Sequence, residues 1–164
     1  MAEGTKEPHD YHTHYMVNFS PDIFHFYLNA VRFYQSLLEN DLKAINEDED
    51  LKSILDKGDL ESFPINEELN RTRRVIEWFV EHIKKGGENA WFYTPNMSHQ
   101  FVRFIKSVST LYLEHLSRRR NALSSRPTIS KTALEAVDQK ISALEEKMQT
   151  HFCPVKPKPW LTGY

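Results

Sequence analysis

Four long stretches of this chain repeat apolar side chains at intervals of three and four residues, the spacing of one face of an α-helix. They begin near Ser20, Asn66, Thr94 and Thr128, and a shorter helical stretch lies around residues 50–57. Amphipathic helices joined by short loops bury their apolar faces against one another. The pattern therefore predicts an all-α, single-domain bundle of about four long helices plus a short helix. No segment alternates long enough to predict a strand.

The chain divides into three parts by pattern. Residues 1–19 lack helical periodicity, are rich in His and Tyr, and are expected to form an extended arm. Residues 20–153 form the predicted bundle, and residues 154–164 are a proline-rich tail of polyproline type. A length of 164 residues fits one domain. Extended arms at both ends of the chain are therefore expected to flank one helical core.

The expected location follows from the cysteine count and from hydropathy. Cys153 is the single cysteine, so an intramolecular disulfide is impossible and a reducing compartment is favoured. The first residues carry no apolar run typical of a signal peptide, and no apolar stretch is long enough to span a membrane. We therefore expect a cytoplasmic protein that does not insert into membranes.

The common signatures of catalytic and metal sites are absent from the sequence. Five scattered glycines cannot form a phosphate-binding loop, and no Gly-x-Ser-x-Gly, Cys-x-x-Cys or Glu-x-x-His motif occurs. His9, His12 and His14 could bind a metal ion weakly, but no further residue follows at the spacing of a structural zinc site. We therefore predict no cofactor, no metal site and no catalytic residue of a common class.

One pair of residues keeps an enzymatic alternative open. A helical projection places His115 on the apolar face of the third long helix and Asp41 on that of the first. A carboxylate that orients a histidine is a general acid–base unit if the two meet. A structural hydrogen bond, or a pair between Asp41 and an arginine, is the other interpretation, because a buried charge needs a partner.

A stripe of cations around one tryptophan is the strongest binding signal. It lies on the second long helix, opposite the predicted core face. Its members are Arg71, Arg74, Trp78, His82 and Lys85. Such a stripe can anchor a protein partner, since Trp and Arg are frequent hot-spot residues. Alternatively, Trp78 is covered by the arm, the fourth helix or the tail.

Further basic and aromatic residues extend the candidate partner-binding set. They are Arg118, Arg119, Arg120 and Trp160. Positive charge near the end of a helix also has a simple electrostatic explanation in the helix dipole. The fourth helix carries Leu134, Val137, Ile141, Leu144 and Met148 in a narrow apolar seam. That seam could pair two copies of the chain in a homodimer.

Together these features favour a non-enzymatic protein-interaction module, a small subunit or adaptor of a larger assembly. A nucleic-acid-binding subunit is the alternative. It would use the basic residues Arg71, Arg74, Lys85, Arg103, Lys106 and Arg118–Arg120 against phosphates. We prefer a protein partner because the net charge of −2 is unlike that of most nucleic-acid-binding domains. A small enzyme built on His115 and Asp41 is the second alternative.

Overall fold

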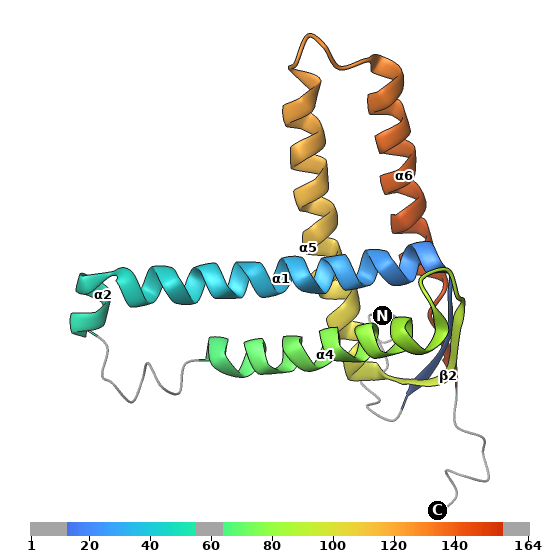
Figure 1. The fold of residues 1–164 in the computed structure, drawn as a ribbon, viewed down its shortest axis with the longest axis horizontal. Helices are drawn as coiled ribbons and strands as arrows, with labels where there is room; N and C mark the ends of the chain where they lie inside the picture. Colours follow the sequence, from blue (N-terminus) through green and yellow to red (C-terminus); the bar gives the residue numbers. More distant parts are fainter. Residues whose placement is uncertain (1–12, 55–63, 156–164) are drawn as a thin grey trace, which may run out of the picture.

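The computed structural model describes residues 13–54 and 64–155 and is mostly helical (Figure 1). The helices are α1 (Pro21–Glu47), α2 (Glu49–Ile54), α4 (Pro64–Gly86), α5 (His99–Ser124) and α6 (Lys131–Thr150). The strands are β1 (His14–Phe19), β2 (Phe92–Ser98) and β3 (Cys153–Val155). The four predicted long helices and the short helix are therefore present. Within the described ranges, no helix combines the length and apolarity needed to cross a bilayer.

Local signals account for the starts of three helices. Ser20 precedes α1 in an extended conformation and Pro21 occupies its first position, as predicted. The Ser98 and Ser130 hydroxyls accept hydrogen bonds from backbone N–H groups of α5 and α6. The third long helix therefore begins at His99 and not near Thr94, because the residues before Ser98 pair in the sheet.

The four long helices form two crossed pairs (Figure 1). α1 and α4 lie side by side and run antiparallel, while α5 and α6 form a hairpin that stands across them. α1 is longer than α4 and extends beyond the start of α4, so α2 lies at the far end of the molecule. The chain is thus mostly helical, as predicted, but its four long helices are arranged as two crossed pairs and do not lie along one common axis.

A small antiparallel sheet corrects the prediction of a chain without strands. Its order is β2-β1-β3, with β1 in the centre. His14 pairs with Ser98 on one side and with Val155 on the other. Residues 14–19 of the predicted arm are thus the central strand, and the start of the predicted tail forms β3. Residues 1–12 and 156–164 lie outside the described ranges.

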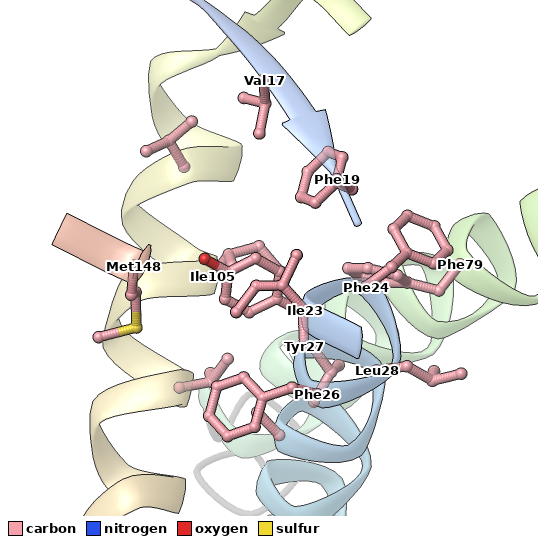
Figure 2. Packing of buried hydrophobic residues seen from close by; sticks show 14 of the residues in the cluster. Val17, Phe19, Ile23, Phe24, Phe26, Tyr27, Leu28, Phe79, Ile105 and Met148 are labelled. Carbon is pink, nitrogen blue, oxygen red and sulfur yellow. The ribbon is translucent and has the colours of Figure 1, made fainter. Parts of the chain in front are cut away.

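The core lies where this sheet meets the N-terminal half of α1, together with α4 and α5. Val17 and Phe19 of β1 point toward Ile23 and Tyr27 of α1 (Figure 2). Met148 brings the end of α6 into the same cluster. Burial of this apolar surface is the main stabilising term of the fold. The helix crossing and the sheet therefore share one apolar cluster.

Two polar contacts connect the end of α6 to the start of α1. The Tyr27 hydroxyl lies 2.6 Å from Nε2 of His151. Lys147 donates a hydrogen bond of 2.7 Å to the Ser20 hydroxyl. Because α6 begins at the far end of the hairpin, these bonds hold its returning end against the core.

Candidate functional site

Two adjoining cavities lie along the line where α4 meets α5. Both are lined by Arg71, Gln100 and Phe104, so they form one continuous concave surface. One cavity has a volume of about 360 Å³ and reaches Tyr34 of α1. The other has a volume of about 330 Å³ and reaches Trp78. We call the two cavities together the α4–α5 groove.

Helical spacing brings both walls of the groove to face each other. Arg71, Arg74 and Trp78 follow one another at intervals of three and four on α4. Phe101 and Phe104 are spaced by three on α5 and line the opposite wall. The N-cap fixes where that wall begins, because the Ser98 hydroxyl accepts from the backbone N–H of Phe101 at 3.2 Å. The groove is thus built from two regular helix faces, and the N-cap at Ser98 fixes the start of one of them.

The groove carries more positive than negative charge. Three guanidinium groups line it, those of Arg71, Arg74 and Arg103, against the single carboxylate of Glu68. Arg71 lies 3.4 Å from that carboxylate and 4.4 Å above the ring of Phe104. Within the described ranges, no ion pair or hydrogen bond engages the side chains of Arg74 and Arg103. These two guanidinium groups are therefore available to a ligand.

Tyr34 fixes the carboxylate at one end of the groove. Its hydroxyl donates a hydrogen bond of 2.8 Å to Oε2 of Glu68. Burial, followed by this bond and the negative charge of Glu68, raises the pKa of Tyr34 to about 12. The phenol therefore remains a donor at neutral pH, and Glu68 holds a fixed position beside Arg71.

Trp78 is half-buried and is covered on one side by aromatic rings. Its ring centroid lies 5.0 Å from that of Phe101, 5.5 Å from that of Phe92 and 5.9 Å from that of Phe24. These rings belong to α5, β2 and α1, so neither α6 nor the predicted arm provides them. The remaining surface of Trp78 lines the groove. Trp78 is thus a fixed apolar wall between two arginines and the core.

The other residues of the predicted stripe lie elsewhere. His82 packs between Trp78 and Phe92, at 4.3 Å from each ring, and its Nδ1 lies 2.6 Å from the carbonyl of Trp78. Lys85 is exposed in the last turn of α4. Of the five predicted stripe residues, Arg71, Arg74 and Trp78 therefore line the groove, and His82 and Lys85 do not.

The second basic cluster lies on the hairpin, away from the groove. Arg120 donates to Asp138 of α6 at 2.8 Å, and Arg118 lies 3.9 Å from Glu114. Arg119 is exposed on the same helix. Trp160, the last predicted partner-binding residue, lies outside the described ranges. Those predicted partner-binding residues that the structure describes are therefore divided between the groove, the end of α4 and the hairpin.

His115 and Asp41 do not form an acid–base unit. The His115 ring packs against Phe33 at 4.4 Å, whereas Asp41 is exposed on the part of α1 that extends toward α2. A helix rises about 1.5 Å per residue, so Asp41 lies roughly 12 Å along α1 from Phe33. The helical projection placed Asp41 on a buried face, but this end of α1 has no buried position after Leu38.

The metal-binding expectation concerns mostly residues outside the described ranges. His14 is exposed on β1, while His9 and His12 precede the first described residue. Within residues 13–54 and 64–155, no group of three His, Cys, Asp or Glu side chains could hold a metal ion. The described residues therefore contain no candidate metal centre.

Sequence reasoning missed the wall of the groove that α5 provides. Phe101 and Phe104 lie on the apolar face of that helix, where core residues are expected, and both belong to the core or pack against it as well as lining the groove. Gln100 and Glu68 carried no signal of their own. Comparisons with models of protein families, with curated proteins and with solved structures gave no significant match.

Proposed function

We propose that this chain is a non-enzymatic protein-interaction module that binds a partner in the α4–α5 groove. The observation that carries the proposal is the continuity of two cavities across Arg71 and Phe104, with free guanidinium groups of Arg74 and Arg103 along them. Apolar walls provide binding energy and the charged groups provide orientation. A role as a small subunit or adaptor of a larger assembly in the cytoplasm belongs to the same proposal.

The mode of recognition that fits best is a short helix or strand laid along the groove. Trp and Arg are enriched among residues that dominate binding energies, especially where they line pockets shielded from water. Trp78 and Arg71 are already held by packing and by a carboxylate, so little side-chain entropy is lost on binding. The groove is therefore preorganised for a partner side chain.

The distribution of basic residues favours a protein over a nucleic acid. A phosphate backbone requires cations that follow one continuous surface. Lys106 instead lies 5.5 Å above the ring of Phe152, and Arg120 is engaged by Asp138. Only part of the predicted nucleic-acid set lines the groove, namely Arg71, Arg74 and Arg103. Nucleic-acid binding is accordingly the second candidate, and the experiment below separates the two.

Site-specific photo-crosslinking in the host cell tests the proposal. A photoreactive phenylalanine replaces Gln100 in the groove or, as the matched control, the exposed Gln139 of α6. We expect position 100 alone to capture a defined protein. That protein, once purified, should bind the wild-type chain and lose affinity for the Arg74→Glu/Arg103→Glu variant. Equal capture at both positions, capture of nucleic acid at position 100, or no capture there would contradict the proposal.

The homodimer through α6 remains a separate prediction. In this chain Ile141, Leu144 and Met148 pack against the core, and Val137 is exposed farther along the hairpin. Much of the apolar seam thus has an intramolecular partner. Substitution of Val137 by Glu tests the exposed part of the seam. It should reduce any self-association of the chain that is made through α6.

A further inference from the structure

The far end of α1 carries a short helix with exposed aliphatic side chains. In α2, Leu51 is 42% exposed and Ile54 is 76% exposed. The two residues are three positions apart, so they lie on one face of the helix. Large aliphatic side chains at such exposure are a common mark of an interaction surface when they occur together. α2 itself lies beyond the start of α4, at a distance from the core (Figure 1).

The first turn of the same helix is acidic, and Lys52 is its one basic residue. Glu49 and Asp50 occupy its first turn, and Glu47 and Asp48 directly precede them. Asp48 caps the helix by accepting from the backbone N–H of Leu51 at 3.0 Å. The Asp50 backbone carbonyl accepts a hydrogen bond from the Ser53 hydroxyl. Within the described ranges, no ion pair or hydrogen bond engages the carboxylate of Glu49 or that of Asp50. α2 therefore presents free carboxylates beside an aliphatic face.

The α4–α5 groove is complementary to α2 in both respects. Its walls include Trp78, Phe101 and Phe104, which match an aliphatic face. Arg74 and Arg103 provide free positive charges where α2 provides free negative ones. Oppositely charged patches on two surfaces favour encounter and fix the register of docking.

Within one chain, α1 keeps α2 away from the groove. Tyr34, which lines the groove, precedes the end of α1 at Glu47 by 13 positions. A helix rises about 1.5 Å per residue, so α2 starts roughly 20 Å beyond Tyr34 along a continuous helix. The groove that α2 can occupy is therefore that of another molecule.

We infer that α2 of one copy docks in the α4–α5 groove of a second copy. Leu51 and Ile54 pack against the aromatic walls, and Glu49 and Asp50 pair with Arg74 and Arg103. This inference rests on the proposed function, because it names the occupant of the same groove. Two reciprocal contacts close a symmetric dimer, whereas a one-way contact continues into longer chains.

A charge-exchange experiment on the full chain tests the inference. The helix variant is Glu49→Lys/Asp50→Lys, and the groove variant is Arg74→Glu/Arg103→Glu. All four side chains are exposed, so both variants should fold. A matched control, Glu135→Lys/Glu146→Lys, changes the net charge of the chain by the same amount as the helix variant, at exposed positions of α6. Sedimentation velocity over a range of protein concentrations measures self-association.

We expect the wild type and the α6 control to self-associate, more weakly as salt is raised. Each variant alone should associate at least about tenfold more weakly, because reversed charges repel across the contact. An equimolar mixture of the two variants should regain association. In the mixture, each acidic α2 meets an unaltered groove, and each basic α2 meets an acidic groove. This recovery also demonstrates that both variants are folded.

Three outcomes would overturn the inference: a monomeric wild type at every concentration, association unchanged by both variants, or no recovery on mixing. The photo-crosslinking experiment separates this failure from failure of the proposed function. If position 100 captures a different protein while the wild type stays monomeric, self-docking is refuted and the protein-binding groove remains. If position 100 captures nothing, both proposals fail.

Discussion

Protonation of His151 should destabilise this fold in mildly acidic solution. Burial, followed by the positive charges of Lys147 and Lys106, lowers the pKa of His151 from 6.5 to about 4. The unfolded chain therefore binds a proton in this range of pH before the folded chain does. The contribution of the neutral His151 imidazole to the free energy of unfolding is fully present above about pH 6.5. It is lost as the pH falls toward 4.

The magnitude follows from the difference between the two pKa values. At about 1.36 kcal/mol for each pH unit, a fall from 6.5 to about 4 corresponds to roughly 3.4 kcal/mol for an imidazole without solvent contact. His151 is only half-buried, and screening by solvent reduces this figure to roughly 1–2 kcal/mol. Such a loss is measurable against the total stability of a domain of this size.

The assay is urea unfolding at a series of pH values, followed by tryptophan fluorescence, for the wild type and His151→Phe. Phenylalanine retains the ring contacts with Phe19 and Phe152 but cannot form a hydrogen bond with the Tyr27 hydroxyl. The variant will therefore be less stable at neutral pH, and the informative quantity is the slope against pH. We expect the free energy of unfolding to fall by roughly 1–2 kcal/mol less in the variant than in the wild type on acidification.

The control is His14→Asn, which removes an exposed imidazole at the start of β1. It should retain the wild-type slope. Equal losses of stability in the wild type and in His151→Phe would refute the reasoning, because the imidazole would then not be the group that titrates.

Three further substitutions test the packing, the helix start and the hairpin. Phe79→Ala should lower the free energy of unfolding by about 3–5 kcal/mol in urea titrations, because Phe79 is fully buried; no change would contradict its place in the core. Ser98→Ala should lower it by about 1 kcal/mol, since the α5 N-cap is lost, and Ser107→Ala at an exposed position should not. Asp138→Asn, which removes the negative charge beside Arg120, should cost at most about 1 kcal/mol, and a larger loss would show that the pair is more than a surface contact.

The helices could be predicted because their signals are local. Ser20 and Pro21 mark the start of α1 in consecutive positions, and the spacing of apolar residues defines its buried face. The sheet could not be predicted in this way. Its central strand contains the exposed Met16 among buried apolar residues, and β2 contains Pro95, which an edge strand tolerates. Pairing with distant segments, and not local pattern, makes these residues strands.

The sequence predicted one wall of the candidate site, the one on α4, but not the opposite wall on α5. A helical projection identified Arg71, Arg74 and Trp78 because all three lie on one stripe of α4. The opposite wall depended on which side of α5 meets α4, and this contact is tertiary. The same limitation explains the error at Asp41. Periodicity continues to the end of α1, but the helices that would bury that end lie nearer its start.

The position of β1 between β2 and β3 has a consequence for folding during synthesis. His14 pairs with Val155, so the sheet joins nearly the first and the last residues that the structure describes. A ribosome releases β3 only after every helix that the structure describes, so the pairing of β1 with β3 cannot form earlier. Contacts between such distant positions slow folding. Until β3 emerges, one edge of β1 remains open to pairing with another nascent chain.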